Sequence, residues 1–463
     1  MPRELRVYTR LEAGAMPCKK LSTHLKVVFI MPKTLHNKTP KIEVSAYAEA
    51  AKSYRKLFQL AKPTMKKGDN LELRKAFLLA LECYKEKQYG SKNVHTRQPI
   101  EIAIIVAEGI GLGTMPIICT LLHGLPATIA PSEIKKIFGA KVVQTLHVLS
   151  ETEGIAQFKG ASSAKISEAL TIDLKKNPQV ILIKLAKNLQ KMRTLAGSSH
   201  EQKAEITSQT KHIYIPIAHR LGLNAIKAEL EDLYLKYTNA KVYHAIKEQI
   251  KSSRDIRERF IQRFKRPVQE LLQGGNFPFT IKARTKSLTS IWNKMQTLDL
   301  IFEQVYDIFA VRIVLTVPAS REKIACWQAY EAVTTLYKVH PKKFRNFLCY
   351  PRSNGYQSLH ATVRSHEGVW VEVQIRTKRM DEIAEKGNAA HWKYKQDSNM
   401  EYLLSPDLWL RQVGALLEKK LRDSDEVVDT ADAGLQMHKI ETRMHKDASA
   451  SLPVSTAVLG CAF

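Results

Sequence analysis

The hydrophobic pattern of this chain changes its period once, at the segment QGGNFPF (273–279). From residue 43 to about residue 265, apolar residues recur every three and four positions, which indicates amphipathic helices. Beyond residue 279, helical stretches alternate with stretches of period two, the spacing of β-strands. We therefore predict two architectures in one chain, an all-α region followed by an α/β region.

Five segments of the first region carry the helical period most clearly: 45–61, 70–88, 99–112, 115–125 and 224–250. Helix-start signals stand at Pro131-Ser132-Glu133, which opens a helix, and at Asn70, which precedes one. The glycines at 109, 111 and 113 have the spacing of a dinucleotide-binding loop. Because they end a helix instead of following a strand, we interpret them as a helix terminus.

The second region predicts alternating strands and helices. The expected elements are a strand at 280–284, a helix through 290–298, a strand at 305–317, a helix from Ser320 to about Val339, and two strands on either side of residue 367. In the last strand, aliphatic residues alternate with Glu372, Gln374 and Arg376. Since alternate residues of a strand point to opposite faces, these three share one face. A glycine turn before the preceding strand presents Tyr356 and His360.

Composition limits the partners. The chain has 463 residues, 44% of them hydrophobic, and a net charge of +27. This excess of Lys and Arg predicts polyanionic partners, namely nucleotides, or a ribosome or RNA contacted through a basic surface. Six widely spaced cysteines fit reduced thiols, and no apolar run approaches the roughly 20 residues of a membrane helix. We predict a cytoplasmic protein without membrane attachment; its oligomeric state stays open.

Three motifs carry a family resemblance: NGYQSLH (354–360), VEVQIRT (371–377) and MDEIAEKGNAAHWKYK (380–395). Together they closely resemble the synthetase domain of the RelA/SpoT family, and the resemblance extends over about residues 44–395. It implies an α/β nucleotidyltransferase-like synthetase domain after an all-α HD-like domain. It further implies a Mg²⁺-dependent enzyme of the stringent response, which makes (p)ppGpp by moving pyrophosphate from ATP to the 3′-hydroxyl of GDP or GTP.

The segment TIKARTKSLTSIWNKMQ (280–296) contains the predicted ATP-binding residues. Lys286, Ser290 and Lys294 follow at intervals of four, and together with Arg284 they lie where a strand meets a helix. Three donors on one helix face beside a helix N-terminus suit a triphosphate. From the residues alone, a solvated lysine stripe is the better explanation. The resemblance assigns all four to ATP.

Asp307 is expected inside a strand that is apolar on both faces. A carboxylate in such a strand must be paired or bound to a metal, because an unpaired buried charge is costly. A salt bridge to Arg312 or another base is one explanation. The resemblance implies the other, in which Asp307 and Glu372 hold Mg²⁺ and Glu372 takes the proton from the attacking 3′-hydroxyl.

Tyr356 is the expected stacking platform for guanine, although a tyrosine at this place would also fit as a cap on the core. The resemblance adds five residues to the GDP or GTP site: Asn354, His360, Lys343, Arg345 and Arg352. It assigns Gln374 and Arg376 as supports around that site. Asn346 departs from the aspartate of the family, which leaves the preference between GDP and GTP open.

The helical half resembles an HD-type hydrolase that has lost its metal ligands. Gln98, Gly124 and Lys187 stand where the family has ligands, and of the metal-binding set only His123 remains. One imidazole does not hold a divalent ion, and the ammonium of Lys187 repels it. We predict that hydrolase activity is lost.

These patterns predict five segments: a basic, poorly ordered extension (1–43), a degenerate HD-type helical domain (44–200), a helical connector (201–272), the synthetase domain (273–395), and a helix at 407–421 with a polar tail (396–463). No segment resembles the TGS or ACT domains of longer family members. The alternative function is a non-catalytic regulator that binds guanine nucleotides or a ribosome. Retention of the carboxylates at 307 and 372 favours the synthetase.

Overall fold

The structure is a computed structural model, and it describes residues 42–88, 98–123, 130–156, 178–275, 277–305, 307–352 and 355–386. The chain divides into two compact units between Lys52 and Ser53. Of the first unit, the structure describes residues 42–52, so the account below concerns the second. Among the described helices, none combines the length and apolar character that a membrane crossing requires.

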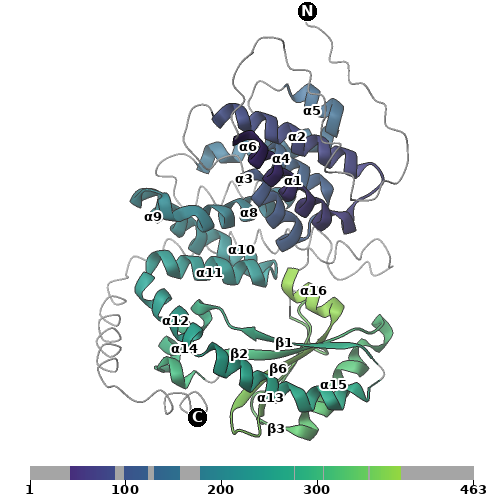
Figure 1. The fold of residues 1–463 in the computed structure, drawn as a ribbon, viewed down its shortest axis with the longest axis vertical. Coiled ribbons are helices and arrows are strands. Elements are labelled where there is room, and N and C mark those ends of the chain that lie inside the picture. Colours follow the sequence, from purple (N-terminus) through teal and green to yellow (C-terminus); the bar gives the residue numbers. More distant parts are fainter. Residues whose placement is uncertain are drawn as a thin grey trace, which may run out of the picture. The chain divides into compact units, whose positions relative to one another are not determined.

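The first region is entirely helical in its described residues (Figure 1). Its helices are α1 (Ile42–Ala61), η2 (Lys62–Thr64), α2 (Asp69–Gln88), α3 (Gln98–Ile104), the π-helical η3 (Ile105–Ile110), α4 (Thr114–Leu122), α5 (Pro131–Phe138), α6 (Ala140–Ala156), α8 (Pro178–Thr194), η4 (Leu195–Gly197), α9 (His200–Gln209), the π-helical η5 (Thr210–Tyr214) and α10 (Ile215–Arg220).

The glycine-rich segment is a helix end, as predicted. Gly111 has φ = 81°, a left-handed conformation that terminates η3, and Gly113 precedes α4. Pro131 is the first residue of α5, also as predicted. The prediction that Asn70 precedes a helix was wrong, because α2 begins at Asp69 and Asn70 is its second residue. The carboxylate of Asp69 accepts a hydrogen bond from the backbone N–H of Lys66.

Three helices connect the regions: α11 (Asn224–Thr238), α12 (Ala240–Ser252) and α13 (Arg254–Gln273). The single helix predicted for 224–250 is thus two helices. The chain breaks at Asn239, whose side chain accepts a hydrogen bond from Val242 N and starts α12. Asn is a favoured N-cap because its side-chain oxygen satisfies a backbone N–H that the first helical turn leaves open.

The second region is built on a mixed six-stranded sheet. Its elements are β1 (Phe279–Thr285), α14 (Leu288–Leu298), η6 (Phe302–Gln304), β2 (Phe309–Leu315), η7 (Ala319–Arg321), α15 (Glu322–Leu336), β3 (Lys338–Val339), β4 (Arg345–Asn346), β5 (Leu359–Arg364), β6 (Trp370–Thr377) and α16 (Lys378–Lys386). The strand order is β1-β2-β6-β5-β3, and β4 pairs with β5. Among the described strands, β2 and β6 form the one parallel pair, with Ala310 opposite Glu372. The predicted order of an all-α region followed by an α/β region is confirmed.

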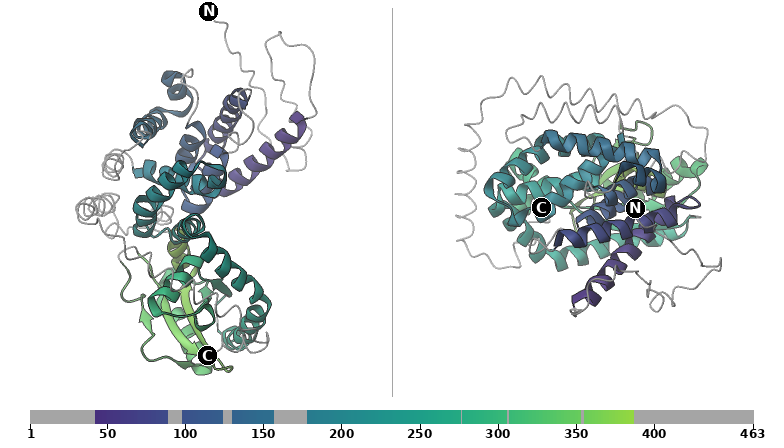
Figure 2. Two further views of the ribbon diagram at one scale, coloured as in Figure 1. Left: turned by 90° about the vertical axis from the view of Figure 1, so that its left-hand side faces the viewer. Right: turned by 90° about the horizontal axis from the view of Figure 1, so that it is seen from above.

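The sheet has one apolar and one polar face. Val371, Val373 and Ile375 of β6 are buried in a core that α13 and α15 also build, and the alternation predicted for this strand is confirmed. Helix α16 contacts β2 and β6, and in Figure 1 it lies on the other side of the sheet from α13 and α15. Figure 2 shows the teal helices of residues 240–273 beside the green strands in its left view.

The segment predicted as a connector also contributes to the cores of the second region. Helix α13 packs on the sheet, and side chains of α11 and α12 form a second core with α14. The contacts of that core are Leu235, Val242 and Ile246 against Ile291, Trp292 and Met295, with Val305 and Ile308 before β2. Helix α14 therefore packs between helices α11 and α12 on one side and the segment before β2 on the other.

Three local expectations need correction. Asp307 precedes β2 instead of lying inside it, because the strand begins at Phe309. Lys286 lies before α14, whose N-cap is Ser287, so it does not share a helix face with Lys294. The helix expected from Ser320 to Val339 runs from Glu322 to Leu336, because β3 takes up the chain at Lys338. The helix predicted at 407–421 lies outside the described residues.

Candidate nucleotide-binding site

Two acidic residues distant in sequence converge on one ammonium group. Lys286 lies just after β1, and its Nζ atom is 2.5 Å from Oδ2 of Asp307 and 3.3 Å from Oε2 of Glu372. Strand register brings the two acids together, because Ala310 near the start of β2 lies opposite Glu372 of β6. The backbone N–H of Lys286 donates to the carbonyl oxygen of Ile308 at 2.8 Å, which holds Lys286 beside the same end of β2. The ammonium of Lys294 on α14 also contacts Oδ2 of Asp307. Asp307 thus pairs with these lysines and not with Arg312.

The ion pairs shift the pKa values of all three groups. Burial alone would raise the pKa of Asp307, but Lys286 and Lys294 outweigh it and hold the pKa below its ordinary value. Burial opposes ionisation of Glu372 in the same way, yet a hydrogen bond from His360 and the charge of Lys286 hold its pKa far below the usual range. Burial lowers the pKa of Lys286, and the two carboxylates raise it more. All three groups are charged at neutral pH.

A second chain of contacts leads from Glu372 to Tyr356. Oε1 of Glu372 lies 3.2 Å from Nδ1 of His360 and accepts a hydrogen bond from Nε2 of Gln374 at 3.1 Å. Nε2 of His360 lies 2.7 Å from the hydroxyl of Tyr356, and Nη1 of Arg376 donates to that hydroxyl at 3.5 Å. The ring of Tyr356 is half-buried, and it follows Gly355, which has φ = 77°.

Further basic and aromatic groups surround this ring. The guanidinium of Arg352 lies 4.6 Å from the ring centre of Phe347 and 5.8 Å from that of Tyr356. Arg345 is exposed on β4, where it pairs with His360, and Lys343 is half-buried nearby in the chain. Asn346 accepts backbone hydrogen bonds from Leu348 and Cys349, both at 3.1 Å, so its side chain closes this loop. Asn354 lies outside the described residues.

Two acidic residues of α16, which sequence reasoning did not select, complete the polar face. Glu385 lies 3.0 Å from Nη1 of Arg284 and 2.8 Å from Nη1 of Arg312. Asp381 lies 3.1 Å from Arg312 and 2.8 Å from Nη2 of Arg376. Burial lowers the pKa of Arg376, which is 1% exposed. The spacing of four between the two acids in MDEIAEK was the signal that could have revealed them.

The N-terminus of α14 is already occupied by protein groups. Asp232 of α11 accepts hydrogen bonds from the backbone N–H groups of Leu288 at 3.2 Å and Thr289 at 2.8 Å. The Ser287 hydroxyl accepts from Ser290 N at 3.3 Å, and the hydroxyls of Ser287 and Ser290 are 2.7 Å apart. These protein groups satisfy the backbone N–H groups of Leu288, Thr289 and Ser290, so the role of this helix end in phosphate binding stays a prediction. Asp232 stands in an acid-rich helix, ELEDLY, and nothing in the sequence distinguishes it from its neighbours.

The degenerate hydrolase positions lie among α3, α4 and α8. Nζ of Lys187 is 3.2 Å from Nδ1 of His123, so the ammonium contacts the remaining histidine of the set. Gln98 is the half-buried first residue of α3, and Gly124 lies outside the described residues. Within the described part of the chain, no group of three or more His, Cys, Asp or Glu could hold a metal ion.

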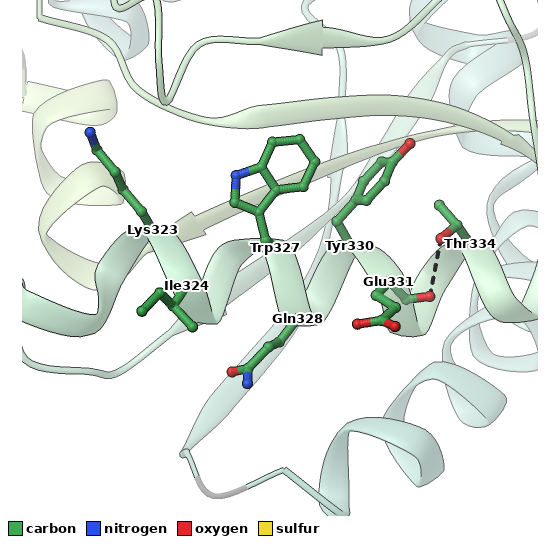
Figure 3. Close-up of a pocket in the computed structure, with 7 residues that line it drawn as sticks. All are labelled: Lys323, Ile324, Trp327, Gln328, Tyr330, Glu331 and Thr334. Atoms are coloured by element: carbon green, nitrogen blue, oxygen red, sulfur yellow. Dashed lines mark hydrogen bonds between the residues drawn. The ribbon is translucent and has the colours of Figure 1, made fainter.

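A pocket of about 460 Å³ lies on the outer side of α15 and contains no predicted site residue. Its lining side chains all project from this one helix (Figure 3): Lys323, Ile324, Trp327, Gln328, Tyr330, Glu331 and Thr334. The hydrogen bond drawn there, from Thr334 to the backbone oxygen of Glu331, lies within the helix. The pocket is thus a surface feature separate from the charged cluster on the sheet.

Two family models match the chain. The model described as an HD domain matches residues 76–224, and the model described as a region found in RelA / SpoT proteins matches residues 283–399. Both matches coincide with the regions described above. The HD match covers the helices from α2 to α10, and the second match covers the sheet and the charged cluster.

Curated relatives match most of the chain. A guanosine-3′,5′-bis(diphosphate) 3′-pyrophosphohydrolase of Vibrio cholerae is 31% identical over 84% of this chain and 55% of that protein. The bifunctional (p)ppGpp synthase/hydrolase SpoT of Escherichia coli K12 is 32% identical over 74% of this chain and 48% of that protein. A GTP pyrophosphokinase of Myxococcus xanthus is 31% identical over 82% of this chain and 50% of that protein.

The chain spans about half the length of the curated relatives that it matches. The matched share nevertheless includes both regions of the fold, because it exceeds 70% of this chain in each case. The order of the two family models along the chain also agrees with the order of the all-α and α/β regions. The chain therefore carries a region of the RelA/SpoT family at residues 283–399, preceded by an HD domain at residues 76–224.

Proposed function

We propose that the protein transfers pyrophosphate from ATP to the 3′-hydroxyl of GDP or GTP and thereby makes (p)ppGpp. The supporting observation is the unbroken set of contacts Lys294–Asp307–Lys286–Glu372–His360–Tyr356. It joins the lysines expected at the ATP phosphates to the ring expected under guanine. The carboxylate suited to the proton transfer stands between them.

The reaction has one bond to form and one to break. The 3′-oxygen of the acceptor attacks the β-phosphorus of ATP, the bond from that phosphorus to the α–β bridging oxygen breaks, and AMP leaves. Glu372 accepts the proton of the 3′-hydroxyl. The hydrogen bond from His360 and the charge of Lys286 both stabilise the ionised carboxylate of Glu372 and make it a weak base. Movement of Lys286 toward the phosphates would remove one of these interactions and make Glu372 a stronger base.

The carboxylates fit a Mg²⁺ ion that arrives with ATP. Both already contact one cationic nitrogen, and Oδ1 of Asp307 is buried without a hydrogen-bond partner among the described residues. Mg²⁺ typically takes one or two protein carboxylates and completes its shell with phosphate oxygens and water. When bound, the ion would neutralise charge on the phosphates. Arg284, Lys286 and Lys294 supply the remaining positive charge around the leaving AMP.

The test is an incubation of the full chain with ATP, GDP and Mg²⁺, scored for ppGpp and AMP. We expect both products in equal amounts and their loss in Asp307→Asn and Glu372→Gln. Glu367→Gln is the matched control, since this exposed carboxylate forms an ion pair with Arg263 and none of the cluster contacts named above. Intact binding of GDP without any product would favour the non-catalytic regulator instead.

We further propose that the HD domain of this chain does not hydrolyse (p)ppGpp. The support is the contact of Lys187 with His123, which puts an ammonium beside the remaining imidazole of the set. A cation at this distance opposes binding of a divalent ion by Coulomb repulsion. Incubation with ppGpp and Mn²⁺ tests this, and release of pyrophosphate would contradict it.

A further inference from the structure

The N-terminus of α14 is held by a residue from outside the RelA/SpoT region. We propose that Asp232 is a positioning residue, which sets α14, and with it Lys286 and Lys294, at the place relative to Asp307 that ATP binding requires. This inference rests on the proposed synthetase function. Residue 232 lies between the matched ranges 76–224 and 283–399, so neither family model covers it.

The two hydrogen bonds of Asp232 give α14 a directional restraint that its apolar core does not provide. Leu235 of α11 and Ile291, Trp292 and Met295 of α14 are buried in one cluster, which sets the separation of the helices. Apolar contact is not directional, so it leaves sliding and rotation of α14 weakly determined. A carboxylate that accepts from two successive N–H groups, at 3.2 and 2.8 Å, fixes both.

The position of α14 determines where both lysines point. Lys286 stands two residues before Leu288, the first residue of the helix, and Lys294 lies nearly two turns further along it. Both ammonium groups contact Oδ2 of Asp307, which belongs to the segment before β2. A small displacement of the helix start would therefore move both cations away from the phosphate position together.

Asp232 also decides which groups an ATP phosphate meets. The free N–H groups of a helix start attract anions. Here Asp232 satisfies those of Leu288 and Thr289, and Ser287 satisfies that of Ser290. The helix start is already neutralised by a carboxylate, which directs the phosphates to the lysines instead.

The test compares Asp232→Ala and Asp232→Asn in the full chain. The matched control is Glu231→Ala, because Glu231 is the adjacent acid of α11 and pairs with Lys227 of the same helix at 2.6 Å. For each variant we would measure kcat and the KM values for ATP and for GDP with Mg²⁺. Hydrogen exchange of the α14 amides without nucleotide is recorded in parallel.

For Asp232→Ala we expect kcat/KM for ATP to fall about 10- to 100-fold, the range that misplacement of binding groups causes. KM for GDP should stay within about twofold, because Asp232 acts only on the ATP side. Asp232→Asn keeps one acceptor oxygen and should lose less. In Asp232→Ala, but not Glu231→Ala, the amides at the start of α14 should exchange faster.

Three results would overturn the inference: an unchanged kcat/KM for ATP, an equal loss toward both substrates, or unaltered exchange at α14 in Asp232→Ala. Tighter ATP binding by Asp232→Ala would likewise count against it, since the carboxylate would then only compete with phosphate. A wild-type chain that makes no ppGpp would refute the proposed function instead. The exchange measurement would still test whether Asp232 holds α14.

Discussion

Lys286 places its ammonium nitrogen 2.5 Å from Oδ2 of Asp307, one of the two carboxylates predicted to hold a metal ion. The same nitrogen lies 3.3 Å from Oε2 of Glu372, so one ammonium forms ion pairs with both acids. The proposed function therefore predicts an exchange of partners. The phosphates of ATP would give the ammonium a new anion, and a divalent ion would give the carboxylates a new cation.

Lys286→Met should lower the rate of ppGpp synthesis about 100-fold or more, because a cation aimed at developing charge is lost. The same variant should bind Mg²⁺ more tightly than the wild type without nucleotide, since Asp307 and Glu372 lose their competitor. Radiolabelled product formation measures the first effect and titration calorimetry with Mg²⁺ the second. Lys251→Met, an exposed lysine of α12, is the control. Unchanged Mg²⁺ affinity in Lys286→Met would count against the exchange.

Tyr356 allows its ring and its hydroxyl to be tested separately. Tyr356→Ala should raise KM for GDP about 10- to 100-fold, because stacking of a base on an aromatic ring contributes roughly 1–3 kcal/mol. Tyr356→Phe keeps the ring and loses the hydroxyl that contacts His360 and Arg376, so KM for GDP should rise less than about threefold. KM for ATP should not change in either variant. Steady-state kinetics with each substrate varied in turn gives all four values, and equal effects of the two substitutions would contradict stacking.

The outline of the fold could be predicted from periodicity alone. The strand from 370 to 377 alternates as expected, because its aliphatic residues must meet the core beneath α13 and α15 while its polar residues face the other way. The same alternation placed Glu372, Gln374 and Arg376 on one face. Strand pairing then brings Glu372 near the start of β2, a relation that no local pattern contains.

What the sequence did not reveal are the residues that act through long-range contacts. Asp232 lies 56 residues from Leu288, and Glu385 lies 101 residues from Arg284. In the sequence Asp232 resembles a solvated acid of an amphipathic helix, and only the spacing of four from Asp381 points to Glu385. The first residue of a strand could not be predicted from the sequence either. Asp307 looked like part of a strand because apolar residues flank it, whereas the strand begins two residues later.

The HD domain should not gain hydrolase activity from one substitution. Lys187→Asp removes the ammonium beside His123 and adds a carboxylate, yet Gln98 still stands where the resemblance expects a ligand. Two ligands do not enclose a catalytic divalent ion, which commonly takes three from the protein. We expect no Mn²⁺-dependent release of pyrophosphate from ppGpp by Lys187→Asp. The combined variant Gln98→His, Gly124→Asp and Lys187→Asp should bind Mn²⁺, as measured by its electron paramagnetic resonance signal. Hydrolysis by the single variant would contradict this account.

Glu385 should make the stability of the sheet region depend on pH. Burial alone would raise its pKa, but Arg284, Arg312 and Arg376 hold the pKa below the usual value of 4.5. A carboxyl with a lowered pKa in the folded state stabilises the protein fully above its unfolded value, and this contribution is lost as the pH falls through the folded value. At pH 7, Glu385→Gln should lower the free energy of unfolding by roughly 2 kcal/mol, because the arginines lose part of their countercharge.

As the pH falls below about 4.5, the difference in unfolding free energy between wild type and Glu385→Gln should shrink, since the wild-type carboxylate becomes protonated and loses the same interaction. Urea unfolding at about pH 7 and about pH 4 measures this difference. Glu248→Gln removes a carboxylate that is 68% exposed on α12 and should show no comparable change. A difference that stays constant between the two pH values would mean that the arginines, and not the charge of Glu385, determine stability here.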